Sequence, residues 1–333
     1  MHIPENYLSP QTCAVMTAAV LPAWVTAIRN VKKNISRSKI PAIGIAAAFS
    51  FLGMMFNVPI PGGSTGHAVG GTLIAILLGP YAACLAVSVS LIIQAFIFGD
   101  GGILAIGANC FNMAFVLPFV GFAIYSFIKN HTKSRTGEMV GAAIGSYVGI
   151  NAAALCAAIE FGIQPMLFKS ASGNALYCPY DISVSIPAMM AGHLTVFGIV
   201  EVAFTVLVLT FVRQTEKDEE AFFSPRDNSV KTPLPVKILL GALIVLTPLG
   251  LLAEGTAWGE WGADEIAATG AGYVPEGMTN GFNFNALIPD YSVSGMPDAL
   301  GYILSAVIGT ALLVIIFKLV SLIGSGKKQG AVA

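Results

Sequence analysis

Eight long apolar stretches constrain what this chain can fold into more than any other feature. A helix needs about 20 mainly apolar residues to cross the hydrocarbon core of a bilayer. Only 11% of the residues are charged, whereas a soluble domain carries about 25%. The stretches lie at about 12–28, 40–57, 81–98, 103–128, 138–160, 188–212, 236–253 and 299–323. We therefore predict an all-α polytopic membrane protein of the plasma (inner) membrane, with about eight or nine transmembrane helices.

A ninth apolar stretch, residues 66–79 (GHAVGGTLIAILLG), is shorter and rich in glycine. At that length it is either a full crossing or a kinked, partly re-entrant helix. If it is a crossing and the N-terminus lies outside, every one of the 17 lysines and arginines except Lys169 falls on the cytoplasmic side. Because cytoplasmic loops are enriched in positive residues, this pattern predicts an external N-terminus and a cytoplasmic C-terminus.

A cleaved signal peptide is the alternative reading of residues 1–27. Such a peptide carries positive charge before its apolar core, whereas here the positive residues follow it, in RNVKK at 29–33. This order indicates a first transmembrane span. We also expect Met1 to be retained, because removal of the initial methionine needs a small second residue and His2 is bulky.

The predicted orientation places the N-terminus, the loop 58–66 (VPIPGGSTG) and the FGDGG turn at 98–102 on one external face, so His2 and His67 can meet. The terminal amine, the His2 amide and the His2 imidazole can chelate one metal ion through fused rings. Ni(II) and Cu(II), which accept square-planar nitrogen ligands, best suit such a chelate, and His67 could supply a fourth nitrogen. The alternative is a frayed His2 and a His67 satisfied by a backbone carbonyl; composition and spacing alone do not decide between them.

Three stretches, MHIPENYLSP, PIPGGSTGHAVGGTLIAILLGPYAACL and FGDGGILAIGANCFNMAF, resemble the signature stretches of the CbiM/NikM family over about residues 1–212. Members of this family are the substrate-capture subunits of cobalt and nickel energy-coupling-factor transporters. The resemblance implies that Met1, His2 and His67 hold the transported Ni(II) or Co(II), with no resident cofactor. It also implies partners: a membrane coupling subunit of CbiQ/NikQ type and ATPase subunits of CbiO/NikO type.

The opening of the chain departs from the commoner family form, MHIPDGFLSP, at three positions. Glu5, Asn6 and Tyr7 replace Asp, Gly and Phe. His2 remains, so we expect the chelate to be retained and the packing of the terminal segment to differ.

The resemblance and the apolar pattern divide the chain into three parts. Residues 1–212 form the predicted metal-capture domain and residues 213–235 a cytoplasmic linker. Residues 236–333 resemble a fused accessory subunit of CbiN/NikN type, with two spans around an external loop at 254–298. The external loops are acidic, which would attract cations or merely reflect the exclusion of positive residues from that side.

Four further residues are candidates for orienting the ligands: Asp100, Asn109, Asn112 and His193. Polar groups behind a ligating imidazole fix its orientation. For Asp100, Asn109 and Asn112 the alternative is turn and helix-cap chemistry, for which the Asp-Gly-Gly of FGDGG is a good signal. His193 could simply pair with a neighbouring helix. Glu201 lies deeper than His193 in the same apolar stretch, and we interpret it as structural or as part of a partner interface.

Ala19, Ala23 and Ala27 form a stripe of small residues at four-residue spacing on the first helix. Such a stripe lets a second helix approach closely, which predicts docking of the coupling subunit there or packing inside the protein. The sequence has no GxxxxGK[ST] motif for nucleotide binding. ATP hydrolysis is therefore expected from a separate polypeptide, and no nucleic-acid partner is expected.

Two other functions remain as alternatives. A self-sufficient secondary carrier would show inverted repeats and a binding site at the midplane, which we do not find in the sequence. A membrane-embedded metalloenzyme would need a catalytic base beside an open metal position, and the sequence has no HExxH or comparable pair. The pattern favours a transporter subunit over an enzyme.

Overall fold

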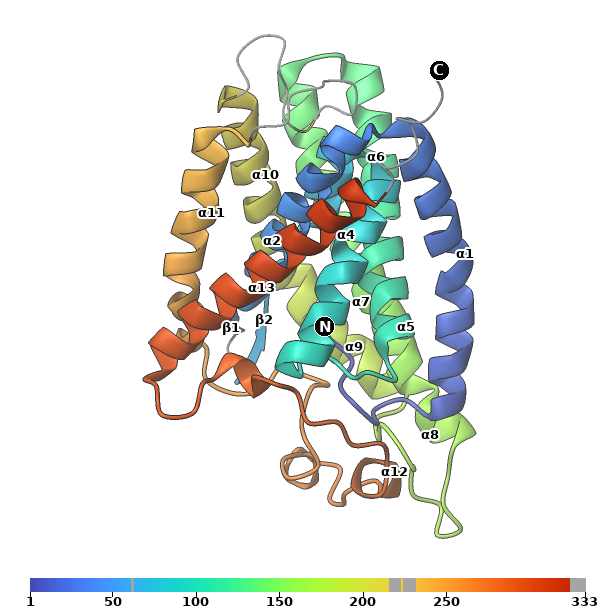
Figure 1. The fold of residues 1–333 in the computed structure, drawn as a ribbon. Helices are drawn as coiled ribbons and strands as arrows, with labels where there is room; N and C mark the ends of the chain where they lie inside the picture. The colour runs from blue at the N-terminus through green and yellow to red at the C-terminus, as the bar shows by residue number, and fades with distance from the viewer. Residues whose placement is uncertain (61–62, 216–222, 224–231, 324–333) are drawn as a thin grey trace, which may run out of the picture.

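The structure is a computed structural model that describes residues 1–333 except 61–62, 216–222, 224–231 and 324–333. Within the described residues, 8 helical segments are long and apolar enough to cross a membrane, and Figure 1 shows them as one bundle. They are Pro10–Asn34, Arg37–Met55, Pro80–Phe98, Ile106–Thr132, Arg135–Leu167, Ile182–Thr215, Leu234–Leu252 and Asp298–Leu322. The prediction of an all-α polytopic membrane protein is confirmed.

Helix α1 (Pro10–Asn34) shows how the sequence sets the ends of a span. The Ser9 side chain accepts a hydrogen bond from the Thr12 backbone N–H, and Pro10 occupies the first turn, where it has no hydrogen bond to lose. Lys32 and Lys33 lie in the last turn, where positive charge complements the helix dipole.

The ninth stretch does not form a full helical span. Strands β1 (Val58–Ile60) and β2 (Ser64–Gly66) pair antiparallel, and helix α3 covers only Gly71–Leu78. Eight residues of helix are about 12 Å long, less than half the thickness of the hydrocarbon core. Residues 65–76 are all buried, and irregular backbone is tolerated at membrane depth where other protein surrounds it.

Close packing through glycine holds α3 against helices α6 (Leu117–Thr132) and α7 (Arg135–Gly162). A Cβ added at Gly121 of α6 would lie 2.0 Å from the Thr72 Oγ1 of α3. The corresponding distance from Gly149 of α7 is 3.0 Å. Small residues at such contacts let membrane helices approach one another closely, so the half-helix has a fixed position in the bundle.

Three spans contain a π-helical turn: η2 (Gln94–Phe98) after α4 (Pro80–Ile93), η3 (Cys110–Val116) between α5 (Ile106–Asn109) and α6, and η4 (His193–Phe197) between α9 (Ile182–Gly192) and α10 (Gly198–Thr215). Such turns are frequent at functional sites. Here they lie at or beside the predicted site residues: Asp100 follows η2, Asn112 lies in η3 and His193 begins η4.

The C-terminal region packs along helix α2 (Ile40–Met55) and over one end of the bundle. Helix α13 (Asp298–Leu322) crosses α2 closely, since a Cβ at Gly309 would lie 2.2 Å from the Phe51 ring. Between η5 (Thr247–Leu252) and α13, residues 253–297 form the segment that we call the capping loop, which contains η6 (Ile266–Ala268), α12 (Glu276–Thr279) and η7 (Pro289–Tyr291). Figure 1 shows this loop beneath the bundle, at the end where residues 1–9 lie.

Candidate metal site

The N-terminal segment is folded into the protein rather than frayed. Met1, His2 and Ile3 are all buried. Asn109, the last residue of helix α5, fixes this segment. Its Oδ1 accepts from the Ile3 N–H at 2.7 Å, and its Nδ2 donates to the Ile3 carbonyl at 3.1 Å. The Gly102 N–H donates to the same carbonyl at 2.8 Å. The alternative of a frayed His2 is therefore wrong, whereas His67 does contact a backbone carbonyl, that of Ala68.

The three departures from the commoner family form each have a structural place. The Glu5 carboxylate accepts from the Ile103 N–H at 2.6 Å, and burial raises the pKa of this carboxyl above its ordinary value. Asn6 adopts a left-handed conformation with φ of 62°, which asparagine tolerates. Tyr7 is fully buried, with its ring 5.4 Å from that of Phe161.

His2 and His67 meet, as the sequence predicts they can. The His2 Nδ1 lies 3.2 Å from the His67 Nε2, and the two side chains are only 3% and 8% exposed. In a square plane, nitrogens at adjacent corners around a metal with bonds of about 2.0–2.1 Å lie about 2.9 Å apart. The pair therefore needs only a small adjustment to bind one metal ion together.

The tautomer of His67 suits this role. Its Nδ1 lies 3.2 Å from the Ala68 carbonyl oxygen, which can only accept, so Nδ1 is the donor. In the neutral ring the lone pair then lies on Nε2, directed at His2. A hydrogen bond from the second ring nitrogen is the usual way in which proteins orient a metal-binding imidazole.

Asp100 lies beside the two imidazoles. One oxygen is 3.2 Å from the His2 Nδ1. The other accepts from the Tyr291 hydroxyl at 2.6 Å and from the Gln94 Nε2 at 3.1 Å. Since a carboxylate held by two donors has a fixed position, Asp100 holds the His2 ring as long as its Nδ1 carries a proton, and this contact ends when Nδ1 binds a metal.

The capping loop contributes two residues that contact the N-terminus and Asp100. Glu260 forms an ion pair with the terminal amine of Met1, and Tyr291 holds Asp100. Glu260, Tyr291 and Gln94 are not among the predicted site residues. No local motif marks Glu260 or Tyr291, because their partners are remote in the sequence.

Two of the four predicted orienting residues have other partners among the described residues. The Asn112 Nδ2 donates to Glu160 Oε2 at 3.0 Å. The His193 Nδ1 donates to the Met189 carbonyl at 2.8 Å. His193 and Met1 both line a cavity of about 430 Å³ beside the N-terminus. Asp100 and Asn109 are thus the predicted residues that contact the N-terminal segment.

The stripe of small residues on α1 turns from the surface into the protein. Ala19 is exposed, Ala23 half-buried and Ala27 buried. Both predicted uses are compatible with this arrangement, since one end can pack internally while the other meets a partner.

A cavity of about 350 Å³ leads to the two imidazoles. Its walls carry three carboxylates, from Asp100, Glu260 and Asp290. Two of them belong to the capping loop, so a cation that approaches His2 and His67 through this cavity passes between the two regions of the chain.

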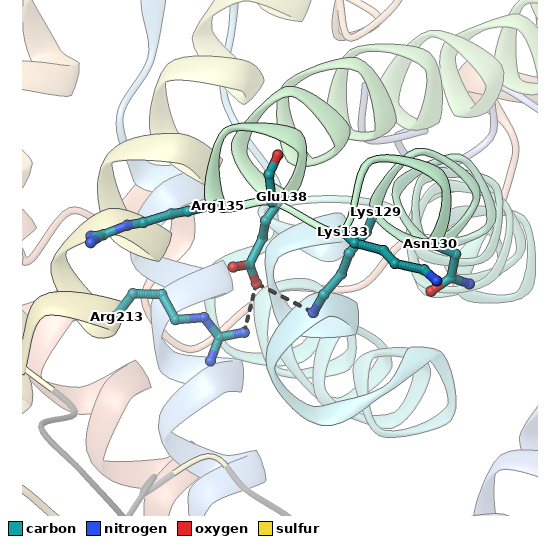
Figure 2. Close-up of a pocket in the computed structure, with 7 residues that line it drawn as sticks. Lys129, Asn130, Lys133, Arg135, Glu138 and Arg213 are labelled. Atoms are coloured by element: carbon teal, nitrogen blue, oxygen red, sulfur yellow. Dashed lines mark hydrogen bonds and ion pairs between the residues drawn. The ribbon is translucent and has the colours of Figure 1, made fainter.

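A second cleft, of about 570 Å³, lies among the ends of α6, α7 and α10 and contains none of the candidate ligands. Figure 2 shows Lys129 and Arg213 converging on the carboxylate of Glu138, at 3.5 and 3.1 Å. Lys133 and Arg135 point away from that carboxylate. This cleft is basic, the reverse of what a divalent cation needs.

Comparison with known proteins identifies two matching families. The family described as "Cobalt uptake substrate-specific transmembrane region" matches residues 2–219, and the PDGLE domain family matches residues 233–325. Similar proteins include a probable fused nickel transport protein of Lactiplantibacillus plantarum, 49% identical over 96% of this chain and 97% of the relative. A fused nickel transport protein of Rhodobacter capsulatus is 44% identical over 94% of this chain and 95% of the relative.

Two solved structures of transition metal transporters are also similar to this chain. A crystal structure of a transition metal transporter is 55% identical, with a TM-score of 0.62 over 66% of this chain and 95% of that chain. A truncated transition metal transporter is 56% identical, with a TM-score of 0.61 over 64% of this chain and 99% of that chain.

Proposed function

Because this chain belongs to the family of the cobalt uptake substrate-specific transmembrane region, we propose that it captures Ni(II) or Co(II) at the outer face of the membrane for delivery inward. The ion is held by four nitrogens: the Met1 amine, the His2 amide, the His2 Nδ1 and the His67 Nε2. The observation that carries the proposal is the 3.2 Å separation of two buried imidazole nitrogens beside a buried N-terminus. Like its relatives, the chain is a transport protein and not an enzyme.

Coordination by these groups exchanges protons for the metal. The amine, the amide and the imidazoles bind only when deprotonated, so metal binding releases protons. The amine must also leave the Glu260 carboxylate. Square-planar nitrogen ligation favours Ni(II) over Co(II), and relatives that match nearly the whole chain are named as nickel transport proteins.

The energy for transport comes from partners in this proposal. The chain lacks a nucleotide-binding motif, so ATPase subunits of CbiO/NikO type and a coupling subunit of CbiQ/NikQ type complete an energy-coupling-factor importer, with the stripe Ala19, Ala23 and Ala27 as a docking surface. The N-terminus lies outside and the C-terminus inside. Metal uptake by cells that contain this chain but no such partner would favour the secondary carrier instead.

We also propose a division of labour along the chain. Residues 1–212 form the capture domain and residues 236–333 the fused accessory region. The linker 213–235 joins them on the cytoplasmic side; most of it, residues 216–222 and 224–231, lies outside the described residues.

The terminal chelate can be tested by extending the N-terminus. The protein with its native Met1 and the protein with one residue added before Met1 are each dialysed against mixed Ni(II) and Co(II), and bound metal is measured by elemental analysis. We expect one metal ion, mainly nickel, in the native protein and none in the extended one. Equal binding by both proteins would remove the amine from the ligand set and refute the proposed site.

A further inference from the structure

We propose that Glu201 is the residue that positions His67 for metal binding, acting through the Ala68–Val69 peptide group. This inference rests on the proposed function in one respect, the role of His67 as a ligand. It changes the interpretation of Glu201 from a structural or partner-facing residue to part of the metal site's support.

Glu201 lies in α10, is 0% exposed and directs its carboxylate at the backbone beyond His67. Oε2 accepts from the Val69 N–H at 2.7 Å and from the Gly70 N–H at 3.1 Å. Oε1 accepts from the Gly70 N–H at 3.0 Å. Three hydrogen bonds to one side chain fix the backbone between β2 and α3.

The Val69 N–H and the Ala68 carbonyl belong to the same peptide group, which is planar and rigid. The carboxylate binds one edge of this plane, and the His67 Nδ1 donates to the other edge at 3.2 Å. A line of contacts therefore runs from Glu201 through one peptide plane to His67, whose Nε2 is directed at His2. Bonds in such a chain polarise one another, which makes the Ala68 oxygen a better acceptor and strengthens the hold on the imidazole.

Two further contacts hold the same backbone. The Ser50 hydroxyl of α2 donates to the Val69 carbonyl at 2.7 Å. A Cβ on Gly70, whose φ is 72°, would lie 2.8 Å from the Phe204 ring of α10. Glu201 and Phe204 are three residues apart and so share one face of the helix. This face of α10 is shaped around the segment that carries His67.

A purely structural explanation accounts poorly for the choice of residue. Acidic side chains inside membrane spans are costly and mark functional sites. Ser50 shows that a neutral hydroxyl can hold this backbone. Glu201 accepts three backbone hydrogen bonds with its two oxygens, more than a single hydroxyl can accept.

The test measures nickel affinity and the rate of nickel release to a competing chelator, using the full chain with its native Met1. Removing a group that supports a metal ligand typically weakens binding about 10- to 100-fold, and we expect that loss for Glu201→Gln. Thr205→Val is the matched control: Thr205 is a buried residue one turn further along α10, and its hydroxyl has no hydrogen-bond partner among the described residues. It should bind nickel like the unmodified protein.

The deciding measurement repeats E201Q in a His67→Ala background. If Glu201 acts through His67, the double variant binds nickel as weakly as H67A alone, because no imidazole remains to be positioned. An equal loss in both backgrounds, or no loss in either, overturns the inference. Should E201Q not fold, Ser50→Ala makes the same comparison, since Ser50 holds the neighbouring carbonyl. Failure of the unmodified protein to bind nickel would refute the proposed function instead.

Discussion

Asn109 holds the N-terminal segment by two hydrogen bonds to Ile3 and thereby fixes the backbone next to the His2 amide. We expect Asn109→Ala to weaken nickel binding about 10-fold or more, as for other residues that support metal ligands. Asn151→Ala is the control, because the Asn151 amide donates within its own helix, to the Tyr147 carbonyl. Both variants are titrated with nickel against a chelator. A similar loss in the two would show a general effect of removing a buried amide.

Protons compete with the metal for each nitrogen of the proposed site. Affinity should therefore fall as the pH is lowered, because each proton that binds occupies a lone pair that the metal needs. Burial lowers the pKa of His67 below its ordinary value, so the His67 imidazole stays available at lower pH than a free imidazole does. A series of nickel titrations at constant ionic strength, from pH 8 down to about 5, checks this expectation. Binding that stays constant over this range would contradict ligation by amine, amide and imidazole.

How far the site could be predicted depends on the range of its contacts. His2 and His67 were predictable because each lies in a recognisable local stretch and the span pattern places both on one face. The ion pair from Met1 to Glu260 and the bond from Tyr291 to Asp100 join residues roughly two hundred positions apart or more. Such contacts follow from tertiary packing, on which a local pattern has no bearing.

At the scale of elements, the short passage between β2 and α3 depends on Gly70. Its φ is 72° and a Cβ would meet the Phe204 ring at 2.8 Å. We expect Gly70→Ala to lower the free energy of unfolding by about 1–3 kcal/mol, since both backbone strain and a clash oppose the methyl group.

Gly173→Ala separates these two causes. Gly173 has a φ of 88° with no atom within 4 Å of the added Cβ, so only the backbone term applies. Thermal unfolding of both variants in the same detergent makes the comparison. If G173A is as unstable as G70A, the close approach of α10 contributes nothing to the cost.

Hydropathy predicted the long spans because each is a continuous apolar stretch long enough to cross the bilayer as a helix. It could not decide whether residues 66–79 form a helix or an extended segment. The apolar composition fits both, and the choice depends on the protein that surrounds the segment. The π-helical turns at 94–98, 110–116 and 193–197 were also missed. A single extra residue per turn leaves no trace in the apolar pattern.

At the scale of the whole molecule, the capping loop contacts the segments that carry the proposed ligands His2 and His67. The Asn6 side chain exchanges two hydrogen bonds with the Phe282 backbone, at 2.8 and 3.0 Å. The Gly277 N–H donates to the Leu176 carbonyl at 2.7 Å, and the Trp258 N–H donates to the Ser64 hydroxyl at 2.8 Å. The fused C-terminal region is thus in direct contact with the segments that carry both histidines.

This arrangement gives Glu260 two opposing effects on the metal. Its carboxylate lines the cavity that leads to His2, where negative charge attracts a cation. It also pairs with the Met1 amine, which must be released before it can bind the metal. The Met1 end of this pair is 2% exposed and the Glu260 side chain 21%, so water screens the pair only in part.

We expect Glu260→Gln to raise the equilibrium affinity for nickel, because the competing ion pair is lost while the four nitrogens remain. The gain should be larger at low pH, where more of the amine is protonated. Glu265→Gln is the control: Glu265 lies in the same loop and accepts from the Thr256 hydroxyl at 2.8 Å, so its loss removes equal charge without freeing the amine. Chelator competition at two pH values distinguishes the effects. Weaker binding by E260Q alone would mean that Glu260 acts mainly by attracting the ion to the site.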